Sequence, residues 1–252
     1  MVDLILFPSS YFNVSKVDED LQAEYDAVKA IGLFDVILFG YDKWFEEDQL
    51  VIKDVPQEER TAVYRGYMMN PEKYERFYQR LLENNIRLIT TPEEYELMHI
   101  FPNVYELLKE DTAKMEIYPL HTQINVDSIK HTFGRFMIKD YVKSVKGTEF
   151  PKYFDKDITQ EEFNQWKEVF YINNKIATIT RNSGQSINAL LPPQQLLEKY
   201  SHLESGYYTV DYAELEDGSW KIIEAGDGQV SGLAEHQDYE QYFKVLYEYL
   251  NE

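Results

Sequence analysis

The first hundred residues alternate apolar runs with amphipathic stretches, and this alternation limits the fold more than any other feature of the sequence. Residues 2–7 form an apolar run rich in β-formers, residues 20–31 have the apolar spacing of a helix that stops before Gly32, and residues 34–39 form a second apolar run. A strand, a helix and a strand in this order predict a βαβ unit with parallel strands. We therefore expect the chain to begin with an open α/β sheet.

Two more strands and two helix starts continue the pattern. Residues 61–67 and 86–89 are predicted strands. Asn70 precedes a proline at the first helical position, and Thr91 begins a segment with the spacing of a capping box, so a helix is expected after each of these strands. The first domain is expected to cover residues 1–115.

The alternation then stops, which predicts a second domain of α+β type over residues 116–252. Its clearest elements are a hairpin turning at Asp217-Gly218 and a closing aromatic-rich helix over about residues 239–250, which we expect to pack on a sheet. The other expected elements are a strand over residues 134–142, a hairpin over residues 168–180 and a helix over residues 194–200. The fold class is therefore α/β followed by α+β.

Composition excludes several classes of function. A hydrophobic content of 44% and an aromatic content of 15% over 252 residues exclude wholesale disorder. The 25 Lys and Arg against 45 Asp and Glu give a net charge of −20, which disfavours nucleic acid as a partner. The absence of cysteine excludes disulfides, thiolate nucleophiles and thiolate metal sites.

The N-terminus favours a cytoplasmic location. Asp3 stands where a signal peptide would be basic, and the apolar run that follows is too short to cross a membrane. We expect no membrane partner. The sequence leaves the oligomeric state open.

The hairpin at Asp217-Gly218 allows its strand register to be predicted. A two-residue loop makes Glu216 face Ser219 and fixes every pair further along the strands. The expected pairs are Leu215–Trp220, Ala213–Ile222 and Asp211–Glu224 on one face, and Glu214–Lys221 on the other.

The Asp211–Glu224 pair is an anomaly, because stability alone selects opposite charges across a strand pair. Two carboxylates about 5 Å apart repel by roughly 3 kcal/mol at an effective dielectric constant of about 20. Asp227 adds a third carboxylate on a glycine-flanked segment, and three hard oxygen ligands suit Mg²⁺. The alternative is that Asp211 and Glu224 lie at a solvated sheet end and share no cation.

Three lysines, Lys139, Lys143 and Lys146, are the natural counterpart of these carboxylates. Lys139 and Lys143 project to one face of the expected strand, and a lysine ammonium group suits phosphate oxygens. Solvated lysines that protect a strand end are the alternative. The glycine spacings of P-loops and of dinucleotide-binding loops are absent.

Two arginines are further candidates. Arg65 ends a predicted strand, where open α/β sheets place residues that contact ligands, although a helix-capping or sheet-edge role fits equally well. Arg181 follows the hairpin predicted over residues 168–180 and is a candidate catalytic anion contact. An exposed strand end is the alternative for Arg181.

Three segments in a fixed order resemble the ATP-grasp superfamily. They are KDYVKSVKG (residues 139–147), FYINNKIA (170–177) and YTVDYAELEDGSWKIIEAGDGQVSGL (208–233). The chain is most similar to a prokaryotic and phage clade of amide-ligase-like members with an arginine- and lysine-based signature. YRGYMM (64–69) and LITTPEEYELMH (88–99) are similar to the N-terminal part of that clade.

The resemblance implies a Rossmann-like N-terminal domain followed by an ATP-grasp domain that binds ATP and Mg²⁺. By position, Lys139 would hold the ATP phosphates with Lys143 or Lys146 assisting, and Asp211 and Glu224 would bind the metal. The implied activity is that of a carboxylate–amine ligase, which activates a carboxylate as an acyl phosphate and transfers it to an amine of a small amino-acid or peptide substrate.

The sequence departs from the family pattern at three places. Glu224-Ala225-Gly226 stands where the superfamily usually has Glu-x-Asn, and Asp227 is a candidate substitute. Only some twenty residues are left for the strand that usually carries the adenine hinge, and Glu168 stands where an arginine is expected. The alternative function is a nucleotide-binding or protein-interaction module that has kept the ATP-grasp fold and lost turnover.

Overall fold

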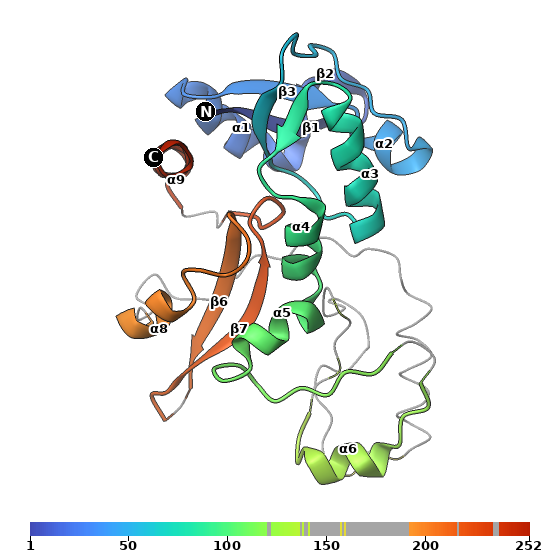
Figure 1. The fold of residues 1–252 in the computed structure, drawn as a ribbon, viewed down its shortest axis with the longest axis vertical. Coiled ribbons are helices and arrows are strands. Elements are labelled where there is room, and N and C mark those ends of the chain that lie inside the picture. The colour runs from blue at the N-terminus through green and yellow to red at the C-terminus, as the bar shows by residue number, and fades with distance from the viewer. Residues whose placement is uncertain are drawn as a thin grey trace.

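The computed structural model describes residues 1–119, 122–136, 138, 141, 157, 159, 192–215, 217–233 and 237–252. An α/β sheet with its helices forms one end of the described structure, and a two-stranded hairpin packs beside helices that continue from it (Figure 1). This mixed architecture confirms the predicted fold class.

Parallel pairing around the first strand builds the N-terminal sheet. β1 (Val2–Ser10) pairs in parallel with β3 (Asp35–Phe39) on one side and with β4 (Arg60–Tyr64) on the other, and β4 pairs in parallel with β5 (Ile86–Leu88). The parallel sheet expected from the alternation is therefore confirmed. The sequence did not reveal β2 (Asn13–Val17), a short antiparallel strand that follows β1 directly.

The predicted helix signals operate as local caps. The side chain of Asn70 accepts a hydrogen bond from the Lys73 N–H at the start of α3 (Pro71–Leu82). Thr91 and Glu94 form both hydrogen bonds of a capping box at the start of α4 (Pro92–His99). These caps satisfy backbone donors that a helix leaves unpaired at its first turn.

Helices cover both faces of the sheet. α1 (Gln22–Ile31), which follows a 3₁₀ turn η1 (Glu19–Leu21), ends at Gly32, whose φ of 66° is the left-handed conformation that glycine adopts at low cost. The sequence analysis missed α2 (Tyr41–Glu47) and α5 (Phe101–Leu108). Each has only seven or eight residues, so too few turns repeat for the apolar spacing to stand out.

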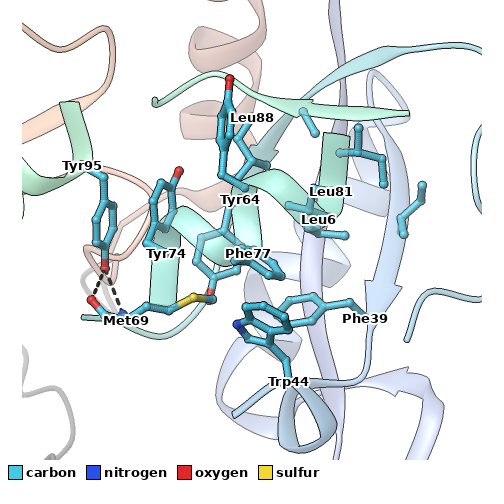
Figure 2. Close-up of a cluster of buried hydrophobic side chains, with 14 of the residues drawn as sticks. Leu6, Phe39, Trp44, Tyr64, Met69, Tyr74, Phe77, Leu81, Leu88 and Tyr95 are labelled. Carbon is cyan, nitrogen blue, oxygen red and sulfur yellow. Dashed lines mark hydrogen bonds between the residues drawn. The ribbon is translucent and has the colours of Figure 1, made fainter. Parts of the chain in front are cut away.

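Two apolar cores lie on opposite faces of the sheet, since alternate residues of β1 point to opposite sides. Leu4 and Leu6 join the core under α2 and α3, an aromatic cluster that also contains Trp44, Tyr64, Tyr74, Phe77 and Tyr95 (Figure 2). Ile5 and Phe7 join the core under α1 and the C-terminal helix.

The C-terminal helix α9 (Tyr239–Asn251) returns to the N-terminal sheet. Its Phe243 and Leu246 pack in the same core as Phe7 and Val28, and the side chain of Asn251 exchanges hydrogen bonds with the backbone of Val2. The prediction that this helix packs on a sheet is confirmed. The domain division at residues 115 and 116 stays a prediction, and α9 packs with the first of those two domains.

A hairpin of β6 (Tyr208–Glu214) and β7 (Trp220–Asp227) forms the second sheet. One of its faces packs on α4 and α5, together with residues around α8 (Gln194–Lys199). α6 (Val126–Thr132) lies away from this hairpin and has a small apolar cluster of its own (Figure 1). The strand predicted over residues 134–142 falls partly, and the hairpin over 168–180 wholly, outside the described residues.

The turn of the hairpin differs from the prediction. The Leu215 N–H donates to the Ser219 carbonyl at 2.8 Å, so three residues rather than two separate the paired positions. Only Gly218 has a positive φ, 79°, among the described turn residues, whereas a two-residue type I′ turn requires it at both central positions. Three of the pairs expected from the two-residue turn are wrong, and the observed ones are Tyr212–Ile222, Ala213–Lys221 and Glu214–Trp220.

A β-bulge restores the predicted register further along the strands. The pairing shifts between Asp211 and Tyr212, because Ile223 is an extra residue between the paired positions Ile222 and Glu224. A bulge of this kind moves the following side chains by one position relative to the partner strand. The predicted pair Asp211–Glu224 is therefore confirmed, although the turn from which it was derived is wrong.

Within the described part of the chain, no helix is both long and apolar enough to span a membrane.

Candidate functional site

Asp211 and Glu224 lie directly opposite each other on the face of the hairpin that points away from the core. Thr209 and Gly226 share this face, as the next pair but one along the strands. Both carboxylate residues are partly exposed. The face is therefore accessible, and it places two hard oxygen ligands across one strand pair.

The other face of the hairpin explains why these carboxylates point outward. Tyr208, Val210, Tyr212, Ile222 and Ala225 contribute to an apolar cluster with Met98, Val104 and Leu108 from α4 and α5. The Ile222 backbone is held as well, since its N–H donates to the Asp111 carbonyl at 2.7 Å and its carbonyl accepts from the Thr112 hydroxyl at 2.8 Å. Burial of one face fixes which residues occupy the opposite one.

Asp227 does not join the pair. It lies three residues beyond Glu224, on the buried face, and is only 1% exposed. Its Oδ1 accepts from the Gln229 N–H at 3.0 Å and from Gln229 Nε2 at 3.4 Å, while its Oδ2 is buried without a hydrogen-bond partner among the described residues. Burial raises the pKa of Asp227 to about 7, although the hydrogen bonds from Gln229 act in the opposite direction. The structure thus brings together two of the three carboxylates that the sequence suggested.

Arg65 occupies the predicted place, at the end of β4, yet it is 1% exposed. Its Nε and Nη2 donate to the two carboxylate oxygens of Glu24 in α1, both at 2.8 Å. Nη1 donates to the Gly228 carbonyl at 2.6 Å and Nη2 to the Ser231 carbonyl at 2.9 Å. Every guanidinium nitrogen therefore has a protein acceptor, and contact with a substrate would require these bonds to open.

The charge of Arg65 is retained in this buried position. Burial lowers the pKa of the guanidinium, but the Glu24 carboxylate more than offsets this effect, so the pKa of Arg65 stays well above its usual value. A bidentate arginine–carboxylate pair is among the strongest hydrogen-bonded ion pairs in proteins. The sheet-edge role that the sequence left open thus describes the observed contacts of Arg65.

Sequence reasoning missed Gln229, which is fully buried. Its Oε1 accepts from the Tyr64 N–H at 3.2 Å, and its Nε2 donates to the Tyr74 hydroxyl at 2.8 Å. A glutamine after a strand carries no sequence signal for such a role, because glutamine is usually exposed.

The proposed phosphate-binding and anion-binding residues Lys139, Lys143, Lys146 and Arg181 lie outside the described residues. Their roles stay predictions.

A divalent cation fits the described residues in part. Asp211 and Glu224 are oxygen ligands of the kind Mg²⁺ prefers, and nucleotide phosphates and water commonly complete its coordination. In the part of the chain that the structure describes, no group of three or more His, Cys, Asp or Glu side chains is arranged to hold a metal. A metal at this pair therefore needs ligands from beyond the two carboxylates.

Comparison with known proteins places this hairpin in a family. Residues 122–246 match the model of an ATP-grasp domain, family 3 of the clade named for its arginine and lysine signature. The whole chain also resembles a solved structure, the D-alanyl-alanine synthetase A from Vibrio cholerae O1 biovar eltor, with a TM-score of 0.57 over 99% of this chain and 96% of that one. The two sequences are 11% identical, so this likeness shows the fold alone.

The chain belongs to the ATP-grasp superfamily, as the family match and the structural likeness agree. Within the superfamily its matched domain is of the arginine- and lysine-signature clade, which confirms the resemblance derived from the sequence. No curated protein sequence matches the chain. The hairpin with Asp211 and Glu224 lies within the matched residues.

Proposed function

We propose that this protein is an ATP- and Mg²⁺-dependent carboxylate–amine ligase that acts in the cytoplasm on a small amino-acid or peptide substrate. The observation that carries the proposal is the Asp211–Glu224 pair on the accessible face of a hairpin in an ATP-grasp domain. Neutral or oppositely charged residues would serve stability better at these positions. A pair of carboxylates kept there favours a site that binds a cation.

In this proposal Asp211 and Glu224 hold the metal, with Asp227 as a candidate ligand only if the end of β7 rearranges. Lys139 holds the phosphates of ATP, Lys143 and Lys146 assist it, and Arg181 contacts the anionic group that forms during transfer. When bound, Mg²⁺ neutralises charge on the transferred phosphoryl group. The contribution of the protein is to position the phosphates and the two substrates, so that a carboxylate is activated as an acyl phosphate and then attacked by the amine.

Calorimetric titration with ATP, with and without Mg²⁺, tests the binding step. Wild-type protein should bind ATP more tightly with Mg²⁺, and Asp211→Asn should lose that difference. Glu214→Gln is the matched control, because Glu214 is an exposed carboxylate on the same strand that faces Trp220 instead of a second carboxylate. Equal responses of wild type and Asp211→Asn to Mg²⁺ would reject the metal site.

A screen for ADP release over pairs of carboxylate and amine substrates tests the chemical step. Release that requires both substrates, and that stops in Lys139→Ala, supports the ligase. ADP release that is independent of the amine would contradict amide formation.

A non-catalytic nucleotide-binding or protein-interaction module is the second candidate. It is favoured by Gly226, which stands where the superfamily usually has asparagine, and by Asp227, which points to the buried face instead of joining Glu224. This candidate predicts Mg²⁺-dependent ATP binding without ADP release for any substrate pair. The two experiments above therefore separate the two functions.

A further inference from the structure

One buried cluster joins the N-terminal sheet to the end of β7, and the proposed chemistry does not use it. Arg65 lies at its centre, with Glu24 on one side and the segment 228–231 on the other. The hydrogen bonds to the Gly228 and Ser231 carbonyls are joined by a backbone bond, in which the Gly66 N–H donates to the Gln229 carbonyl at 3.3 Å. The segment that follows β7 is thus attached to the carboxyl end of β4.

The same cluster also holds the beginning of β6. The Gly228 N–H donates to the carbonyl of Tyr207, the residue before β6, at 3.0 Å. The Tyr207 hydroxyl lies 3.4 Å from Arg65 Nη1 and is hydrogen-bonded to the Tyr242 hydroxyl of α9. Both strands that carry the candidate metal ligands are therefore anchored at one end by contacts around a single guanidinium group.

Two glycines allow the segments to approach this closely. A Cβ atom at Gly66 would overlap the Tyr64 hydroxyl oxygen, and one at Gly228 would lie 2.7 Å from the Tyr207 ring. Neither position is compatible with an ordinary side chain without movement of the ring. The cluster is therefore closely fitted on both sides of Arg65.

We propose that Arg65 and Glu24 are positioning residues for the candidate metal pair. They fix the end of β7 and the start of β6 against the N-terminal sheet, and thereby fix Glu224 opposite Asp211. This inference rests on the proposed function, because it assigns Arg65 the task of supporting the metal ligands instead of contacting the substrate.

Stability alone is a weak reason to keep such a pair. A buried ion pair loses its hydration, and replacing it by well-packed apolar residues is often neutral or stabilising. A planar guanidinium with five directed donors does what apolar packing does not, since it fixes several carbonyl groups at defined angles. Glu224 is four residues from Gly228, or about 13 Å along an extended strand, so a displacement at the anchor reaches the ligand through one rigid element.

The test compares Mg²⁺ affinity with Mg²⁺-free nucleotide affinity in Arg65→Lys and Glu24→Gln. The probes are MgCl₂, titrated in the presence of a non-hydrolysable ATP analogue, and the same analogue titrated without metal. If the two residues position the metal ligands, the apparent Mg²⁺ affinity should fall by about 10–100-fold, as for other groups that orient metal ligands. The metal-free affinity for the analogue should stay at the wild-type value.

Two controls separate positioning from a general loss of stability. Arg60→Lys changes the arginine at the opposite end of β4, whose ion pairs with Asp3 and Asp35 lie at a partly exposed position. Leu81→Ala removes a buried side chain from the other core and should lower the melting temperature without touching the cluster. Neither control should change the Mg²⁺ affinity.

Arg65→Lys retains the charge and is expected to keep more Mg²⁺ affinity than Arg65→Met. Tyr207→Phe removes only the hydroxyl contact and provides a milder variant if the charged ones do not fold, with a smaller loss of Mg²⁺ affinity expected. Folded variants with wild-type Mg²⁺ affinity would overturn the positioning role while leaving the metal site intact. If wild-type protein shows no Mg²⁺-dependent nucleotide binding at all, the proposed function fails first, and the positioning role fails with it.

Discussion

The two faces of the β6–β7 hairpin carry acidic residues in opposite circumstances. On the accessible face, Glu224 lies opposite Asp211 and both are partly exposed. On the buried face, Asp227 is 1% exposed, beside the aromatic core that contains Tyr74 and Tyr95. Only three residues separate Glu224 from Asp227 along the same strand.

The difference teaches that carboxylates close in sequence can serve different purposes when a strand alternates its faces. The exposed pair stays open to solvent and to a cation, whereas Asp227 is surrounded by protein and accepts its hydrogen bonds from Gln229. We expect the exposed pair to determine ligand binding and the buried residue to determine how stability depends on pH. Four measurements test this distinction.

The largest effect is expected for Asp227. The raised pKa of Asp227, about 7, means that the native state keeps this proton at pH values where the unfolded state has already released it. The stabilisation is thus fully present near pH 4 and is lost as the pH rises to about 7, up to about 4 kcal/mol at 1.36 kcal/mol per pKa unit. Denaturant unfolding of Asp227→Asn should lack this loss of stability.

Asp127→Asn provides the control for that experiment, because Asp127 is an exposed carboxylate in α6. It should retain the pH dependence of the wild type. An unchanged pH profile in Asp227→Asn would show that Asp227 is ionised in the folded protein and would remove the distinction between the two faces.

The second measurement compares two neighbouring isoleucines on β7. Ile222 is 1% exposed and packs in the core face, whereas Ile223 is the bulge residue and is 53% exposed. Ile222→Ala should lower the free energy of unfolding by about 3 kcal/mol, because it leaves a cavity. Ile223→Ala should change it by less than about 0.5 kcal/mol. Similar losses in the two variants would contradict the assigned faces.

The third measurement concerns ligand-induced stability. Mg²⁺ with an ATP analogue at about 100 times its dissociation constant should stabilise the wild type by about 2.7 kcal/mol. Asp211→Asn and Glu224→Gln relieve the carboxylate repulsion, so each should match or exceed the wild type in thermal stability without ligand and should lose most of that gain. Two destabilised variants that respond to the ligand like the wild type would make these carboxylates structural.

The smallest effect is expected at the turn. Gly218 has a φ of 79°, and a Cβ atom there would meet no other atom within 4 Å. Gly218→Ala should therefore cost only the strain of a left-handed backbone, about 1 kcal/mol, with no change in Mg²⁺ binding. Thermal unfolding measures this cost, and altered Mg²⁺ affinity would indicate that the turn controls the register of the distant pair.

Sequence patterns predicted the N-terminal sheet well because its signals are local. Buried parallel strands such as β1 and β3 are continuous apolar runs, and the caps at Asn70 and Thr91 act within one helical turn. The short helix α2 has no comparable signal. Its burial depends on Trp44 meeting Phe77 across the fold, which is a tertiary contact.

The candidate site was predictable only in part. Alternation along a hairpin correctly placed Asp211 opposite Glu224, but the bulge at Ile223 follows from packing that no single strand encodes. The burial of Arg65 was equally hidden, since its partners Glu24 and Gly228 lie far from it in sequence. Charged side chains at strand ends are exposed unless distant segments supply acceptors, and sequence spacing does not show such acceptors.

The return of α9 to the first strand has a consequence for synthesis on the ribosome. Ile5, Phe7 and Phe34 belong to a sheet face that is complete only when Phe243 and Leu246 cover it. An N-terminal domain commonly folds while the rest of its chain is still being made, but here a segment more than 200 residues downstream must first emerge. Until then, this nascent chain presents an apolar surface of the kind that chaperones bind.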